Sequence, residues 1–199
     1  FYQNQGDGTF LERTGDVGMA GAYGPGLGLS TADFNGDGWI DIFVANDQQE
    51  NQLWINRRDG TFDDLALLAG TALGASGALN ADMGVDAGDY DNDGDRDLFV
   101  ANGHTYPQAD LPHTNTSYAM TNFLFENLGD GTYRDVTANA GTGFRIVEVS
   151  RGAAFGDIDD DGDIDIFITN LNGRPNLLRN DSELGNSGPN GRSTHNFLM

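Results

Sequence analysis

The sequence has no cysteine, which excludes a disulfide framework and a metal site built from thiolates. It also has no long apolar run, and no segment approaches the roughly 20 apolar residues that a membrane-spanning helix needs. We therefore expect no direct insertion into a membrane. The 199 residues suffice for a domain of ordinary size with a core of its own.

Positive charge is also scarce. Only 10 residues are lysine or arginine, all of them arginine, against 31 that are aspartate or glutamate, and the formal net charge is −21. A surface this acidic repels nucleic acid and anionic lipid, so neither is an expected partner. What the chain does contain is acidic side chains and glycine in a repeated arrangement.

Three nine-residue segments, which begin at Asp33, Asp89 and Asp157, share one acidic pattern. Each has oxygen-bearing side chains at positions 1, 3, 5 and 9 and glycine at position 6. This spacing wraps a short loop around one hard cation, and calcium takes about six to eight oxygen ligands in irregular geometry. Glycine permits the sharp turn, and position 7 is expected to offer its carbonyl. The predicted ligands of three calcium sites are Asp33, Asn35, Asp37, Trp39 and Asp41; Asp89, Asp91, Asp93, Asp95 and Asp97; and Asp157, Asp159, Asp161, Asp163 and Asp165.

The residues after each loop decide which calcium motif this is. A single acidic run is commonly a solvated loop, but three copies in register, each followed by an apolar segment, favour metal binding. An EF-hand needs a glutamate at position 12 and a following helix. Position 12 is Val44, Val100 or Ile168, in short aromatic and β-branched segments that are typical of buried strands. The sequence therefore predicts strand–loop–strand units and excludes EF-hands.

A second motif recurs at residues 4–10, 56–62 and 127–133, where Asp-Gly between strand-like segments predicts a tight hairpin. One repeat then becomes a four-stranded antiparallel meander with the calcium loop between strands one and two. Four short strands in each repeat are typical of a β-propeller blade. Small residues in the first strand suit the crowded innermost position. A β-solenoid is the alternative, but its periods are shorter and its turns less varied.

The predicted fold is thus all-β and a partial propeller. Residues 103–121 form a long insertion with His104, Tyr106, His113 and Tyr118, and we favour packing of its aromatic rings on a propeller face over a catalytic role. The expected divisions are 1–20, outer strands of a preceding blade; 21–70, a blade with the first loop; 71–142, a blade with the second loop and the insertion; 143–180, a partial blade with the third loop; and 181–199, a linker toward a C-terminal β domain.

The combination resembles the FG-GAP/VCBS repeat of integrin-α-type propellers. Residues 102–107, 122–131, 150–157, 169–173 and 195–198 are similar to the cartilage-acidic-protein (ASPIC/UnbV) group. The resemblance implies a closed ring of blades followed by a small β domain that residues 195–198 would begin, and it implies calcium ligands at positions 1, 3, 5 and 9. This chain supplies only part of such a ring, so further chain, other copies or other proteins would cover its open edges. Asn35 replaces a carboxylate, so we expect the first site to be the weakest.

These observations predict an exported, calcium-stabilised module for protein interaction, adhesion or scaffolding, located outside the cell or in the periplasm, where calcium is plentiful. No nucleophile and base are paired by local spacing, so we expect no enzymatic activity. One alternative is a propeller hydrolase or lyase with His104 and His113 in a face pocket. Another is a polysaccharide-binding propeller with Trp39, Tyr90 and Tyr106 around one rim.

Overall fold

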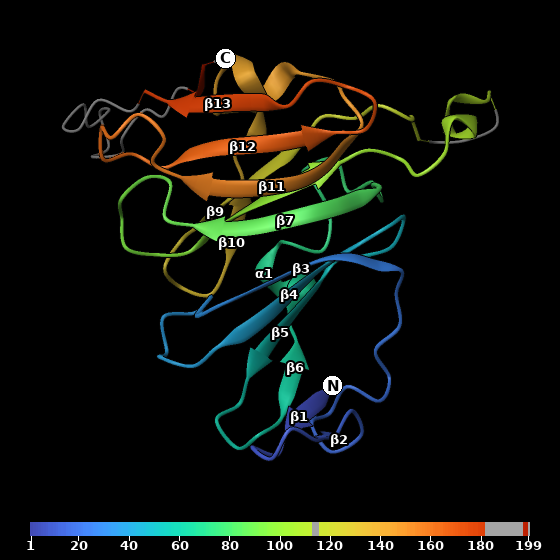
Figure 1. Cartoon of the computed structure of the whole chain (residues 1–199), viewed down its shortest axis with the longest axis vertical. Coiled ribbons are helices and arrows are strands. Elements are labelled where there is room, and N and C mark those ends of the chain that lie inside the picture. Colours follow the sequence, from blue (N-terminus) through green and yellow to red (C-terminus); the bar gives the residue numbers. More distant parts are fainter. Residues whose placement is uncertain (113–115, 182–196, 199) are drawn as a thin grey trace.

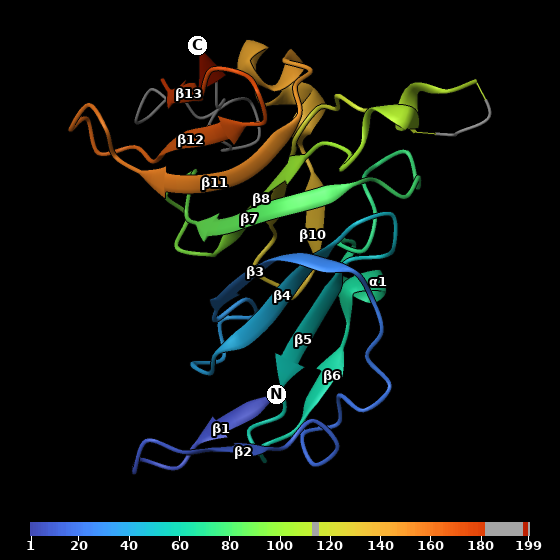
Figure 2. The same cartoon turned by 45° about the vertical axis from the view of Figure 1, so that its right-hand side comes forward.

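The computed structural model describes residues 1–112, 116–181 and 197–198, and these residues form an all-β fold. Three four-stranded antiparallel sheets follow one another, each with its strands in chain order, after one two-stranded hairpin. Figures 1 and 2 show the three sheets stacked along the long axis, with the first strand of each sheet beside the first strand of the next. The predicted all-β partial propeller is confirmed.

Each sheet has the predicted meander, and the helical segments lie in the connections. The hairpin is β1 (Tyr2–Asn4) and β2 (Phe10–Glu12); the first blade is β3 (Gly26–Ala32), β4 (Asp41–Asn46), β5 (Gln52–Asn56) and β6 (Phe62–Asp64), followed by α1 (Ala66–Ala69). The second is β7 (Asp82–Gly88), β8 (Asp97–Asn102), β9 (Phe123–Asn127) and β10 (Tyr133–Asp135), with 3-10 turns at Pro107–Asp110, Thr137–Asn139 and Thr142–Arg145. The third is β11 (Ser150–Gly156), β12 (Asp165–Asn170), β13 (Asn176–Asn180) and β14 (Phe197–Leu198).

The first strands of neighbouring blades pack closely because they carry glycine where they meet. A Cβ on Gly28 in β3 would lie 2.5 Å from the carbonyl oxygen of Met83, and one on Gly84 in β7 would lie 2.4 Å from that of Arg151. All three sheets also have a register shift near the start of their first strand. The repeat is therefore maintained down to its irregularities.

Two apolar cores fill the spaces between successive blades. In β8, Leu98 and Val100 belong to the core shared with the first blade, whereas Phe99 and Ala101 belong to the core shared with the third. Both faces of this strand are buried, which explains why its sequence is a continuous apolar run rather than an alternating one.

The third sheet corrects the expectation of a partial blade. Phe197–Leu198 pairs antiparallel with Arg179 and Asn180 of β13 and supplies the fourth strand of this sheet. The ring of Phe197 is fully buried and lies 5.4 Å from that of Phe144 and 6.0 Å from that of Tyr90. A polar segment separates this strand from β13, which hides the pairing in the sequence. Most of that segment, the expected linker, lies outside the described residues.

The Asp-Gly hairpins are built as predicted. In each turn one aspartate oxygen accepts hydrogen bonds from the amide and the hydroxyl of the threonine two residues later, as Asp130 does from Thr132 at 3.0 and 2.5 Å. Asp7 and Asp59 make the same pair of bonds. Among the described residues, no helix has the length and apolar character to cross a membrane.

Candidate metal centres

The three acidic loops each connect the first strand of a blade to the second, and their carboxylates fix their shape. The position-1 aspartate accepts hydrogen bonds from the amides of positions 5 and 6, as Asp89 does from Asp93 and Gly94 at 3.0 Å. Equivalent bonds hold the other two loops. The position-5 aspartate accepts a bond from the amide of position 7 at 2.9–3.0 Å in every loop. The ligand side chains are therefore oriented by the protein itself.

Glycine at position 6 adopts the positive φ that the sequence predicted, 86°, 95° or 100°. Position 4 is also left-handed, although a different residue occupies it in each loop: Gly36, Asn92 and Asp160. Sequence reasoning missed this second special position, because only one of the three copies marks it with glycine. Asn and Asp tolerate the left-handed region better than other residues.

Position 9 is a fully buried aspartate in every loop, namely Asp41, Asp97 and Asp165. One oxygen accepts a hydrogen bond from the amide of position 2 at 2.9–3.0 Å. The other accepts one at 2.8 Å from the asparagine that ends the third strand of the same blade. Burial raises the pKa of Asp41 and raises that of Asp97 to about 8. A buried carboxylate that faces neutral amides and other acids is an arrangement that a bound cation would stabilise.

In the second and third loops the carboxylates converge. Oxygen atoms from three aspartates lie within 4.8 Å of one another in each: Asp89, Asp91 and Asp97, and Asp157, Asp159 and Asp161. Burial first, and then the neighbouring charge of Asp93, raises the pKa of Asp91 to about 7. Like charges at this separation repel. These two clusters therefore have the chemistry to hold a hard divalent cation.

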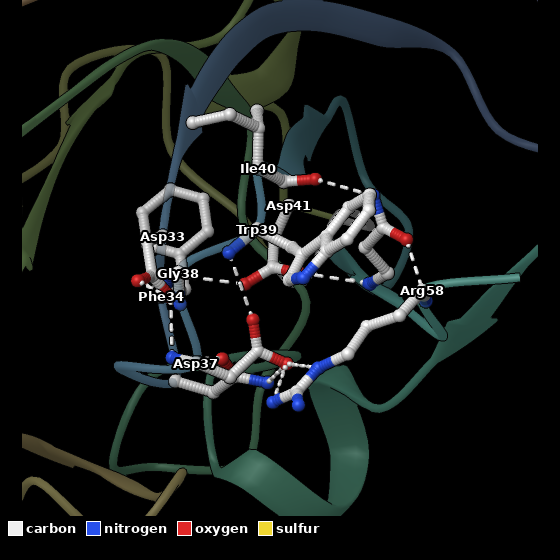
Figure 3. Close-up of polar contacts among 10 residues, drawn as sticks. Asp33, Phe34, Asp37, Gly38, Trp39, Ile40, Asp41 and Arg58 are labelled. Carbon is white, nitrogen blue, oxygen red and sulfur yellow. Dashed lines mark hydrogen bonds and ion pairs between the residues drawn. The ribbon is translucent and has the colours of Figure 1, made fainter. Parts of the chain in front are cut away.

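The first loop differs because an arginine reaches into it (Figure 3). Arg58, in the turn between β5 and β6, places Nη2 2.9 Å and Nε 3.1 Å from Oδ2 of Asp37. The side-chain amide of Asn35 donates to the same oxygen at 3.3 Å. Burial raises the pKa of Asp37, but the hydrogen bonds from Arg58 and from the Trp39 amide outweigh it, so the pKa lies below its ordinary value. The position-5 carboxylate of this loop thus already has a cation partner.

Sequence reasoning also missed Arg58, although the turn motif contained the signal. Arg58 stands at the place that Gly6 and Gly129 hold in the other two turns, and all three residues have positive φ, 63°, 82° and 72°. A non-glycine residue is rare in that conformation. At Gly129 a Cβ would lie 2.7 Å from Oδ2 of Asp95 in the second loop. The turn of the first blade therefore contacts its loop through the Arg58 side chain, whereas the turn of the second contacts its loop through the close approach of Gly129 to Asp95.

The first and second loops also connect neighbouring blades through hydrogen bonds and apolar contacts, and in this sense they are joints between blades. The carbonyl oxygen at position 2 accepts a hydrogen bond from the next blade: Phe34 from Asn127 at 3.0 Å and Tyr90 from Asn180 at 2.8 Å. The rings of Phe34 and Tyr90 are buried in the two inter-blade cores. Ile158 is the position-2 residue of the third loop, onto which no described blade packs, and it is 53% exposed. Packing of position 2 therefore depends on the following blade.

A direct bond also joins the second and third loops, because the side-chain amide of Asn92 donates to Oδ1 of Asp163 at 2.9 Å. Asp163, predicted to contribute its carbonyl at position 7, is itself buried. Arg179 lies close to the third loop as well, with Nε 3.9 Å from Oδ2 of Asp159, but its shorter ion pair, 2.7 Å, is with Asp181.

The prediction that Trp39, Tyr90 and Tyr106 surround one polysaccharide-binding rim is wrong. Tyr90 is buried between blades, and Trp39 lies in the first loop, whereas Tyr106 follows β8 at the opposite strand ends. These three rings do not surround one rim. His104 is buried beside a cavity, and His113 lies outside the described residues.

Blades of four strands with an acidic loop after the first strand define a repeat protein of the propeller class. The family model described as FG-GAP-like repeat matches residues 1–44 and 33–100, and the chain belongs to that family. It is 27% identical over 169 residues to cartilage acidic protein 1 of Xenopus tropicalis, which covers 84% of this chain and 24% of the relative. It is 28% identical over 101 residues to cartilage acidic protein 1 of Mus musculus, which covers 51% of this chain and 15% of the relative. The resemblance noted in the sequence is confirmed, and the chain spans about a quarter or less of these relatives.

Proposed function

We propose that the three acidic loops bind calcium and that the bound ions hold neighbouring blades together. The observation that carries the proposal is the repeated donor set. In each loop, oxygen-bearing side chains are oriented by backbone amides around a buried position-9 aspartate. Carboxylate, amide and carbonyl oxygens in a flexible loop are the ligands that calcium prefers. Membership of the FG-GAP-like repeat family supports the same assignment.

The expected role of the ion is structural. When bound, calcium neutralises the converging carboxylates, while Asp33, Asp89 and Asp157 continue to accept hydrogen bonds from their loop amides. A ligand present at a hundredfold excess over its Kd stabilises the folded state by about 2.7 kcal/mol for each site. That amount is large against a total stability of roughly 5–15 kcal/mol. Because the loops are joints, this stabilisation would act on the arrangement of the blades.

We further propose that the chain is part of an exported protein-interaction, adhesion or scaffold module, outside the cell or in the periplasm. Loops of this kind have affinities suited to millimolar calcium, which those compartments supply. The similarity to cartilage acidic protein 1 and the strongly acidic surface are compatible with such a role. Extended repeat surfaces suit binding to other proteins.

Thermal unfolding with millimolar calcium and with excess chelator tests the calcium proposal. We expect chelation to lower the midpoint by at least about 10 °C. Asp93→Asn combined with Asp161→Asn should remove most of this difference. The matched control is Asp7→Asn combined with Asp130→Asn, which makes the same charge change in the hairpin turns and should retain it. An unchanged midpoint on chelation would contradict the proposal.

The role that we favour is binding rather than catalysis. The enzymatic alternative required His104 and His113 beside one cleft. His104 does line a cavity, whereas the position of His113 lies outside the described residues. Assays for glycoside and ester hydrolysis with the full chain test this alternative: turnover that His104→Gln abolishes would establish it.

A further inference from the structure

A cavity of about 540 Å³ lies at the ends of the strands opposite the acidic loops. Its lining comes from the first two blades and from the insertion: Gln48, Ala78, Leu79, His104, Tyr106, Ala109 and Thr116. Gln48 follows β4 and His104 follows β8, and both strands begin at their acidic loops. The cavity is therefore about 20 Å, one strand length, from the loops. In Figure 1 the loops extend to the left and the insertion to the right. Its volume falls in the range of about 300–1,000 Å³ that is typical of small-molecule sites.

Two buried polar groups of this lining have no hydrogen-bond partner in the part of the chain that the structure describes. The side chain of His104 is 1% exposed, and neither Nδ1 nor Nε2 is bonded. The buried Oγ1 of Thr116 has no partner either. More than nine in ten buried polar groups are paired, and an unpaired one costs about 1–3 kcal/mol. Two such groups on one cavity are therefore available to hydrogen-bond a ligand.

Backbone hydrogen bonds fix the positions of two lining residues, His104 and Gln48. The amide of His104 donates to the carbonyl oxygen of Tyr118 at 2.9 Å, and the carbonyl oxygen of His104 accepts from Nη2 of Arg151 at 2.8 Å. Gln48 has a φ of 55°, and its amide donates to the carbonyl oxygen of Asn80 at 2.8 Å. A non-glycine residue held in the left-handed region is strained, and such strain is found preferentially at functional sites.

The lining determines the chemical class of the ligand. Among the described residues, it contains no lysine, arginine, aspartate or glutamate, so none of these side chains neutralises a charged ligand. An imidazole, a hydroxyl and an amide offer both donors and acceptors. The Tyr106 ring, 48% exposed and 4.3 Å from the His104 ring, forms an apolar wall together with alanine and leucine side chains. The ligand that fits is neutral and rich in hydroxyl groups, with one apolar face.

We propose that this cavity binds a neutral sugar residue of a glycan. The apolar face of the sugar ring lies against Tyr106, and its hydroxyl groups form hydrogen bonds with His104 and Thr116. Gln48 is placed to provide a further bond from the first blade. The inference does not rest on calcium binding, because none of the lining residues belongs to an acidic loop.

Calorimetric titration of the full chain, in calcium, with neutral tetrasaccharides tests the proposal. The probes are cellotetraose, xylotetraose, mannotetraose, maltotetraose and chitotetraose, with tetragalacturonate as the charged counterpart. We expect saturable binding of at least one neutral probe and none of tetragalacturonate. Addition of the bound probe should also shift the ring nitrogen resonances of His104. If no neutral probe binds, or if only the charged one does, the cavity holds water alone or another ligand and the proposal is overturned.

Two substitutions then assign the binding to this cavity. Tyr106→Ala removes an exposed ring and should weaken binding about tenfold or more. Thr116→Val removes an unpartnered hydroxyl without changing the shape of the side chain, so it should weaken binding severalfold and leave the unfolding midpoint unchanged. Tyr2→Ala, which removes an exposed tyrosine ring far from the cavity, is the matched control. A probe that binds equally well to Tyr106→Ala and Thr116→Val would contradict the assignment.

Discussion

The first and second acidic loops have the same backbone design and the same buried position-9 aspartate, but they balance their charge differently. In the second loop, oxygen atoms of three aspartates lie within 4.8 Å of one another. In the first loop, Asn35 replaces one carboxylate and Arg58 pairs with Asp37. The difference shows that the charge balance of a loop can change while its backbone conformation and hydrogen bonds stay the same. A turn two strands away sets the charge without altering the scaffold.

The shared scaffold predicts the largest effect. Asp97→Ala would leave the amides of Tyr90 and Asn127 without their acceptor in a buried site. We expect a loss of about 3 kcal/mol in the free energy of unfolding in calcium, measured by chemical denaturation. Asp41→Ala should cost a similar amount, since its bonds are the same. Asp95→Ala, at position 7, is the control and should cost far less. A mild effect of Asp97→Ala would show that this bonding is dispensable.

The first and second blades also differ where their first strands begin. In the first blade β3 starts with Gly26, whereas in the second β7 starts with the carboxylate of Asp82. Burial raises the pKa of Asp82 from 3.8 to about 7, against a hydrogen bond from Asn51 at 2.6 Å that lowers it. The folded protein therefore holds this proton more tightly than the unfolded chain. The charged form destabilises the fold increasingly as pH rises from 3.8 to about 7.

Asp82→Asn should accordingly stabilise the protein, and by more at pH 8 than at pH 5. We expect the two gains to differ by on the order of 2 kcal/mol. Unfolding is to be measured in calcium at both pH values, so that the loop carboxylates stay bound. Asp16→Asn, an exposed substitution of the same kind, should give no such difference. Equal gains at both pH values for Asp82→Asn would contradict the expected titration.

Removal of the Arg58 side chain, which pairs with Asp37, should make the first loop more like the second. Arg58→Gly deletes the guanidinium at Asp37 and places glycine where the other turns have it. We expect the calcium affinity of the first loop to rise about tenfold, or about 1.4 kcal/mol, measured by titration calorimetry. Arg57→Gly, in which the lost partner is Asp63 rather than a loop residue, should leave the affinity unchanged. An affinity that falls in Arg58→Gly would mean that Arg58 helps to organise the site.

The remaining difference between the loops is the ligand at position 3. Asn35→Asp supplies the carboxylate that Asp91 and Asp159 provide in the other loops. We expect a severalfold gain in calcium affinity, because affinity rises with the charge of the ligands. The same substitution should lower the midpoint in chelator, since it adds repulsion to the empty loop. Equal midpoints of the variant and the parent in chelator would show that the added charge is fully solvated.

Much of this arrangement was predictable from local sequence. Short apolar segments rich in aromatic and β-branched residues, Asp-Gly turns and the glycine at position 6 each reflect a short-range constraint, so they predicted the strands and the loops. The joint between blades was not predictable, because Asn127 and Asn180 bond to residues about ninety positions earlier. The reach of Arg58 to Asp37 likewise depends on tertiary packing. The fourth strand of the third blade was misassigned because a polar segment separates Phe197 from its partner.

The most direct test of the account is a calcium-binding isotherm of the full chain after exhaustive chelation. The account predicts three calcium ions per chain, two of them bound more tightly than the third, with Arg58→Gly tightening only the weak site. Three identical sites would show that Arg58 and Asn35 do not set the affinity of the first loop. An absence of saturable calcium binding would contradict the account altogether.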